Sequence, residues 1–196
     1  MEIIIRVADA NDFHYAPAIC ELIKESAKVR GTGIAERKPE YVCTKFENGN
    51  AVIALCDGQL AGFCYIEVWS HDRYVANSGL IVAPEFRRLG LARKIKERVF
   101  QLSREKYPSA HVFGITTSLA VMRINSRLGY EPVTFSELTQ DEAFWNGCQS
   151  CPNFDILERN ERRMCLCTAM LAPALEETTT LATDLSNLIL PNQPSE

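Results

Sequence analysis

The segment "NSGLIVAPEFRRLGLARKI", residues 77–95, decides how the rest of the chain can be organised. An apolar run ends at Pro84, two arginines and Gly90 follow, and apolar residues then recur at helical spacing from Leu91. The pattern predicts a strand, a short loop and an amphipathic helix. Because a helix N-terminus has unpaired N–H groups and a partial positive charge, the loop is suited to a pyrophosphate. Taken alone, the string is more often simply the basic, solvated first turn of a helix.

The flanking sequence predicts further strands and helices around this unit. A strong hairpin signal, Asp57-Gly58, joins two apolar runs within residues 50–69. Patterning predicts strands over residues 2–7, 74–84, 109–118, 131–138 and 162–171, and helices over 11–26, 40–48, from 91, and 119–130. We therefore expect an α/β (α+β) fold, with a mixed, mostly antiparallel seven-stranded sheet flanked by about four helices.

Length and composition limit the classes of function. The 196 residues are 46% hydrophobic and 23% charged, as expected for one globular domain. The net charge of −4 argues against broad nucleic-acid binding, which needs clustered Lys and Arg. The sequence shows no basic leader and no apolar stretch of membrane-spanning length, so a cytoplasmic protein that binds no membrane is expected. We expect the domain over residues 1–171 and a flexible polar tail over 172–196.

The combination of strand, R-x-x-G-x-A loop and amphipathic helix resembles the GNAT superfamily of N-acetyltransferases. The resemblance covers about residues 3–171 and implies the fold of that family. It also implies acetyl-CoA as co-substrate. Leu80 and Val82 would supply backbone contacts to acetyl-CoA, and the phosphates would be held by Arg87, Arg88, Leu89, Gly90, Leu91 and Ala92.

A second block, "SLAVMRINSRLGYEPV" at residues 118–133, matches another family block in part. Ser118 stands where the family has Asn, and Asn125 stands where it has a Tyr that often protonates the leaving thiolate. The departure argues against a tyrosine acid here. Asn125 either hydrogen-bonds the cofactor or only caps and packs.

The implied reaction is direct attack of a primary amine on the thioester, with the Leu80 N–H stabilising the oxyanion. Since amines are mostly protonated at neutral pH, a carboxylate, a histidine or a water chain must accept a proton. Glu67 and His71, near the end of the third predicted strand, are the candidates by position, and alternation along the strand favours Glu67. The alternative is that both are ordinary surface residues without a catalytic role.

The loop "KVRGTGIAERKPE", residues 28–40, lies where this superfamily usually sets acceptor specificity. Its guanidinium groups, Arg30 and Arg37, suit a carboxylate-bearing acceptor such as glutamate, although a solvated charged loop explains the same residues. The whole sequence also resembles a subfamily associated with arginine biosynthesis, hence with amino-acid metabolism. Another acyl-CoA is also compatible as the donor.

Four of the eight cysteines are paired in sequence, in "GCQSC" and "CLC". Cys148, Cys151, Cys165 and Cys167 could hold one structural Zn²⁺, with Cys165 and Cys167 on one face of the last strand. They would brace an insertion over residues 136–161, between the last two strands. Reduced core thiols and a redox pair are the alternatives.

The leading hypothesis is an enzyme that acetylates a small amine, with acetyl-CoA and that amine as its partners. A protein lysine or N-terminal acetyltransferase is the alternative within the class, and a non-catalytic acyl-CoA-binding regulatory module is the alternative outside it. A homodimer is the assembly considered.

Overall fold

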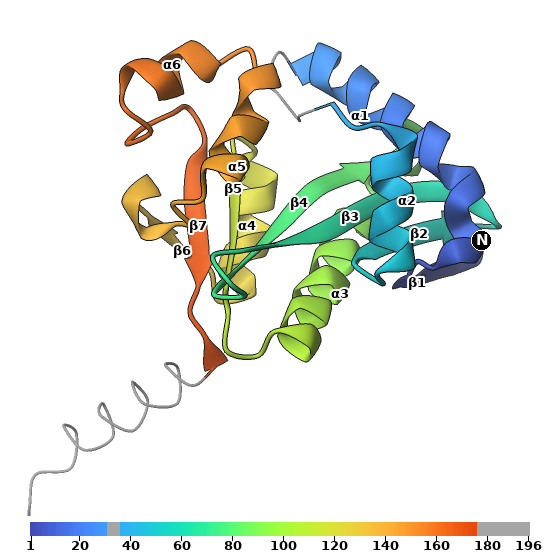
Figure 1. The fold of residues 1–196 in the computed structure, drawn as a ribbon. Coiled ribbons are helices and arrows are strands. Elements are labelled where there is room, and N and C mark those ends of the chain that lie inside the picture. Colours follow the sequence, from blue (N-terminus) through green and yellow to red (C-terminus); the bar gives the residue numbers. More distant parts are fainter. Residues whose placement is uncertain (31–35, 176–196) are drawn as a thin grey trace, which may run out of the picture.

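The computed structural model describes residues 1–30 and 36–175. Within these ranges seven strands form one sheet in the order β1-β2-β3-β4-β5-β7-β6 (Figure 1). Only β4 and β5 pair in parallel. The strands are β1 Ile3–Val7, β2 Ala51–Cys56, β3 Gln59–Trp69, β4 Tyr74–Val82, β5 His111–Thr116, β6 Glu131–Val133 and β7 Thr168–Ala172. The expected fold class and seven-stranded sheet are confirmed.

The described residues also form six α-helices and four 3-10 helices. The α-helices are α1 Ala16–Arg30, α2 Pro39–Glu47, α3 Leu91–Lys106, α4 Leu119–Arg127, α5 Glu142–Asn146 and α6 Phe154–Arg159. The 3-10 helices are η1 Ala10–Tyr15, η2 Pro84–Phe86, η3 Phe135–Glu137 and η4 Gly147–Ser150. No helix in the described ranges is long and apolar enough to cross a membrane.

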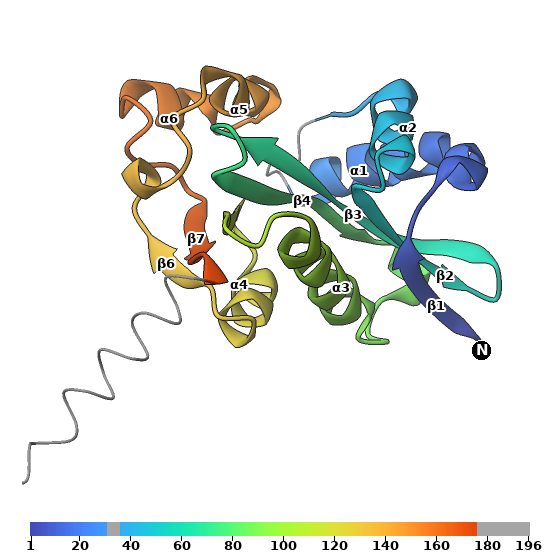
Figure 2. The ribbon, with the colours of Figure 1, turned by 60° about the horizontal axis from the view of Figure 1, so that its bottom comes forward.

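The central strands are buried on both faces because helices cover both sides of the sheet (Figure 2). Along β3, Phe63 packs with α1 and α2, whereas Cys64 and Ile66 pack with α3. This alternation follows from the period-2 geometry of a strand. The helix α3 buries the aliphatic stripe predicted from the sequence, Leu91, Ile95, Val99 and Leu102. Each such side chain contributes about 1.5–3 kcal/mol of hydrophobic stabilisation.

The segment between β6 and β7 forms a separate cap over the sheet. Trp145 and Leu157 are buried against Phe113 of β5 and Ala76 of β4. The Trp145 Nε1–H also donates to the Thr139 carbonyl at 2.9 Å. The cap spans residues 134–167 rather than 136–161, and it contains α5 and α6, which the sequence did not predict as helices.

The last two strands are shorter than predicted. β6 ends at Val133, because Thr134 begins the capped 3-10 helix η3, in which the Glu137 carboxylate accepts from the Thr134 N–H at 2.7 Å. β7 begins at Thr168, so the prediction that Cys165 and Cys167 lie on one strand face is wrong. Both cysteines precede the strand. The expected boundary at 171/172 falls inside β7, and residues 176–196 lie outside the described part.

Candidate active site

The strands β4 and β5 separate at the centre of the sheet. They pair only from Tyr74 to Ala76 with His111 to Phe113. Beyond that point β4 contains an irregularity opposite Cys64, and Gly79 has a φ of 68°. A Cβ at Gly79 would lie 2.5 Å from the ring of Tyr65 on β3, so the close approach of β3 to β4 requires glycine at this position. The edge of β4 that faces β5 is therefore open from about Ser78 onward.

The loop predicted to bind phosphate lies directly after this open edge. Arg88 and Gly90 have positive φ values of 67° and 75°, and Gly90 is the N-cap of α3 without a side-chain cap. Such a conformation turns successive N–H groups toward one side, which suits an anion. The Arg87 and Arg88 side chains are exposed, and Arg87 Nε donates to the Val82 carbonyl at 3.2 Å.

The other predicted loop residues are close to the same turn but differ in what they can offer. Leu89 is 38% exposed, whereas Leu91 is 1% exposed and faces the core. Leu91 can therefore contact a phosphate only through its backbone N–H. Ala92 follows it in the first turn of α3 and is half-buried.

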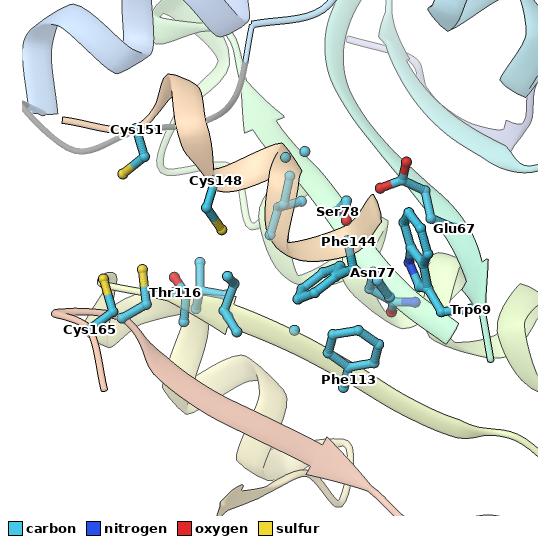
Figure 3. A pocket seen from close by; sticks show the side chains of 18 of the residues that line it. Glu67, Trp69, Asn77, Ser78, Phe113, Thr116, Phe144, Cys148, Cys151 and Cys165 are labelled. Carbon is cyan, nitrogen blue, oxygen red and sulfur yellow. The ribbon is translucent and has the colours of Figure 1, made fainter. Parts of the chain in front are cut away.

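A cavity of about 250 Å³ lies where β4 and β5 diverge, beneath the cap formed by residues 134–167 (Figure 3). Leu80 and Asn125 line this cavity, but Val82 does not. Figure 3 shows Glu67 and Trp69 on one side and Cys148 and Cys165 on the other. Its lining is mostly apolar, with a few polar groups, as in typical small-molecule sites.

Glu67 is held at the cavity by residues of α2. Its carboxylate accepts a hydrogen bond from the Tyr41 hydroxyl and lies 3.7 Å from Lys45 Nζ. Burial lowers the pKa of Lys45, although the neighbouring Glu67 opposes this shift. A carboxylate positioned in this way can accept a proton.

Arg37 lies beside this group, also against the cavity. Its Nε donates to the Tyr65 hydroxyl at 2.9 Å, and Nη1 donates to the Glu36 carbonyl at 3.1 Å. The guanidinium stacks over the Tyr41 ring, with 5.1 Å between Cζ and the ring centroid. Burial raises the pKa of Tyr65 to about 12, so its hydroxyl stays neutral. The result is a cation fixed in orientation at the cavity wall.

Asn125 is 1% exposed and lines the cavity from α4. Its Nδ2 lies 3.7 Å from Met170 Sδ, and its Oδ1 has no hydrogen-bond partner among the described residues. A buried orphan acceptor is costly unless a ligand or water satisfies it. Ser118, at the other altered family position, caps α4 by accepting from the Val121 N–H at 3.4 Å.

A buried lysine, Lys96 of α3, also lines the cavity. Its Nζ donates to Asn77 Oδ1 at 3.1 Å and lies 5.0 Å from the centroid of the Tyr130 ring. Asn77 Oδ1 also accepts from the Tyr130 hydroxyl at 2.9 Å, and Asn77 Nδ2 donates to Ser103 Oγ at 2.8 Å. These contacts form a polar network beneath β4.

The four paired cysteines line one end of the cavity. Cys148 and Cys165 lie on facing segments there (Figure 3). Burial raises the pKa of Cys148 to about 11 and that of Cys167 to about 12. Their thiols are therefore neutral near pH 7. Among the described residues no three histidine, cysteine or acidic side chains are placed to hold a metal ion, so the zinc interpretation gains no support.

Of the remaining predicted residues, one lies away from the cavity and the side chain of the other falls outside the described part of the structure. His71 lies in the exposed β3–β4 turn, with a φ of 55°, and does not line the cavity. Arg30 is the last residue of α1, and its side chain lies outside the described part of the structure.

Sequence reasoning missed Tyr41, Lys45, Tyr65 and Lys96. The residue spacing in the sequence nevertheless contains signals for these four residues. Tyr41 and Lys45 are four residues apart on one face of α2, and Tyr65 and Glu67 are two apart on one face of β3. Lys96 precedes the buried Val99 by three residues, which places it on the covered side of α3.

The sequence profile described as the acetyltransferase (GNAT) family matches residues 17–122, which run from α1 into α4 and include the open edge and the loop. A search of curated proteins gives no match.

Solved acetyltransferase structures share the fold. The Rv2747 protein of Mycobacterium tuberculosis, solved with CoA, is 19% identical with a TM-score of 0.63, over 88% of this chain and 99% of that one. The putative acetyltransferase yncA of Salmonella typhimurium, solved with acetyl-CoA, is 16% identical with a TM-score of 0.59. This match covers 100% of this chain and 99% of that one.

N-acetylglutamate synthase of Neisseria gonorrhoeae, complexed with coenzyme A and N-acetyl-glutamate, is 18% identical with a TM-score of 0.62. The match covers 88% of this chain but 35% of that enzyme's chain. At such identities the likeness establishes the fold alone. The family profile, however, covers more than half of the chain. The protein therefore belongs to the GNAT acetyltransferase family and is an N-acetyltransferase.

Proposed function

We propose that the protein transfers an acetyl group from acetyl-CoA to the primary amine of a small acceptor that carries a carboxylate, such as an amino acid. Glutamate is the first candidate, because the Neisseria enzyme of similar fold is an N-acetylglutamate synthase. The observation that carries the proposal is Arg37, held against a capped cavity that also contains Glu67.

Acetyl-CoA would bind along the phosphate loop and the open edge of β4. The N–H groups around Gly90, with Arg87 and Arg88, would hold the pyrophosphate. The backbone of Leu80 and Val82 would pair with the pantetheine arm, which brings the thioester to the cavity. The orphaned Asn125 Oδ1 supports this path, since it is an unsatisfied acceptor in the cavity wall.

The acceptor would occupy the part of the cavity beneath the cap. Arg37 has N–H groups beyond its two hydrogen bonds, and a guanidinium pairs with a carboxylate through a fork of two donors. The cap limits the space: Phe144 and Cys148 line the cavity from above. A cavity of about 250 Å³ beneath the cap suits a small amine better than a peptide segment.

In this arrangement Glu67 would accept the proton of the attacking amine. The amine nitrogen would form the new C–N bond, and the Leu80 N–H would stabilise the oxyanion of the tetrahedral intermediate. Departure of the CoA sulfur would complete the transfer.

The test is to incubate the protein with acetyl-CoA and a panel of amino acids, simple amines and lysine peptides. Release of free CoA is followed with a thiol reagent, and the acetylated product is identified by mass spectrometry. We expect turnover with acceptors that contain an α-carboxylate or side-chain carboxylate. Turnover on peptides alone would indicate a protein acetyltransferase. Tight CoA binding without turnover would indicate a binding module.

A substitution at Arg37 tests the acceptor site directly. Arg37→Lys keeps the charge but loses the fork, so we expect the acceptor KM to rise about 10-fold or more, with the KM for acetyl-CoA nearly unchanged. Lys38→Met is the matched control, because Lys38 is the adjacent cation, is exposed and does not line the cavity. Equal effects of the two variants would argue against the acceptor role of Arg37.

A further inference from the structure

Lys96 is a buried cation that the proposed reaction has not used. It is 2% exposed, and no carboxylate pairs with it among the residues that the structure describes. Its interactions are the hydrogen bond to Asn77 Oδ1 and the contact with the Tyr130 ring. An ammonium group has three donors, so most of its hydrogen-bonding capacity is unused by these contacts.

A purely structural role explains this lysine poorly. Removing an ammonium from water costs free energy unless the charge is paired, and an apolar side chain of similar volume would pack here without that cost. The Asn77 side chain does not need Lys96, because it also accepts from Tyr130 and donates to Ser103. A buried charge that lacks a carboxylate partner among the described residues and lies in a cavity wall is typical of a functional group.

The position of Lys96 relates it to the thioester rather than to the acceptor carboxylate. Lys96 lies one and a half turns into α3, which begins at the phosphate loop, and its Nζ reaches Asn77 of β4. Asn77 precedes Leu80, the residue proposed to contact the acyl group, by three positions. Lys96, Leu80 and Asn125 all line the one cavity. Asn125 stands where the family resemblance places a tyrosine acid, and an amide is too weak an acid to supply the proton.

We propose that the Lys96 ammonium donates a proton to the sulfur of CoA as the thioester breaks. The inference rests on the function proposed above. The amine nitrogen forms the C–N bond and gives up its proton to Glu67 or water. The C–S bond breaks with its electron pair on sulfur, and an Nζ–H of Lys96 protonates it. The products are the N-acetylated acceptor and the CoA thiol, and Lys96 regains its proton from solvent.

The groups around Lys96 are compatible with this role. Cys64 of β3 and Tyr130, which follows α4, are the titratable groups that face it, and Arg104 of α3 interacts electrostatically with Tyr130. Burial raises the pKa of Cys64 to about 11 and raises that of Tyr130, so both are neutral at pH 7. Burial also lowers the pKa of Lys96 to about 8, which is close to that of an ordinary thiol. Proton transfer from the Lys96 ammonium to the CoA sulfur is then nearly balanced in free energy.

The test uses two variants of Lys96 that remove different parts of its side chain chemistry. Lys96→Gln keeps an N–H donor for Asn77 but removes the charge and the acid, whereas Lys96→Met removes the donor as well. Lys24→Gln, on the exposed face of α1, is the matched control. We expect kcat to fall about 100-fold in both Lys96 variants and not in the control, as for loss of a general acid. In the wild type kcat should decline as the pH rises through about 8, and Lys96→Gln should lose this decline.

A binding readout does not depend on turnover. The ultraviolet absorbance of the thiolate gives the pKa of the CoA thiol when CoA is bound. A nearby ammonium favours the thiolate, so we expect about 10-fold more thiolate at a given pH than in free CoA, and loss of this difference in Lys96→Gln. This measurement needs only the wild type if a variant fails to fold.

The outcomes separate the two proposals. Unchanged kcat in a folded Lys96→Gln variant, or an unshifted thiol pKa in the wild type, would overturn the role of Lys96 while acetyl transfer stands. Failure of the wild type to bind CoA would instead overturn the proposed function and, with it, this inference.

Discussion

Gly90 allows the phosphate loop to be tested separately from the fold. Its φ of 75° favours glycine, and no atom lies within 4 Å of a Cβ built there. Gly90→Ala should therefore destabilise the protein only through its backbone conformation, by about 1 kcal/mol. For a chain of this size, that lowers Tm by roughly 3 °C.

Gly90→Trp carries the same backbone cost but places an indole over the N–H groups of the loop. If two charge-assisted hydrogen bonds to the pyrophosphate are lost, at about 1.5 kcal/mol each, binding weakens by about 3 kcal/mol. This corresponds to a roughly 100-fold higher Kd for CoA. Calorimetric titration with CoA gives the Kd, and thermal unfolding without ligand gives the stability.

Gly49→Ala is the matched control. Gly49 has a φ of 57°, and a Cβ there would make only an ordinary contact of 3.9 Å with Val7. It lies beside Lys106, at the opposite end of α3. A 16-residue helix is about 24 Å long, so this site is remote from the loop. We expect a similar loss of Tm and an unchanged Kd. A folded Gly90→Trp variant with wild-type affinity would refute the assignment of the loop.

Three further predictions follow from the buried charges and thiols. Lys96→Met should raise Tm at pH 6–7, because it removes a desolvated charge. Between about pH 8 and 10.5 the unfolded wild type binds more protons than the folded one, so the stability of the wild type should rise with pH. The difference in Tm between Lys96→Met and the wild type should therefore narrow over this range, which thermal unfolding at several pH values will measure. Glu67→Gln removes the base, so kcat should fall about 100-fold, but it keeps an acceptor for the Tyr41 hydroxyl, so Tm should change little. A rate within threefold of wild type would assign the proton to water. Cys148 and Cys167 should be alkylated at least about 100-fold more slowly than free cysteine at pH 8, because their raised pKa values leave little thiolate, and rapid labelling by mass spectrometry would contradict this.

Much of the fold follows from short-range signals in the sequence. The turn at Asp57-Gly58 has φ values of 47° and 77°, as its residue types predict, and it joins β2 to β3. α3 begins at Leu91, where the apolar periodicity starts. These features depend on backbone preferences and on spacing within one element, so neighbouring residues determine them.

The cap shows where such signals end. α5 has five residues and α6 has six, too short to be stable or recognisable by periodicity alone. They form because Trp145 and Leu157 pack on β4 and β5, which lie far away in the sequence. β7 begins only at Thr168, so Cys165 and Cys167 precede the strand and line the cavity.

By itself, then, the sequence determined the loop at Gly90, the helix after it and the candidate base Glu67, since each rests on local spacing. Only the tertiary structure decided which charges share the cavity. It brings Arg37 and Lys45 to Glu67, leaves His71 in an exposed turn and buries Lys96 without a carboxylate partner among the described residues. These relations join α2, β3, β4 and α3, and their distances depend on how the helices pack on a twisted sheet. No pattern within a single element contains that information.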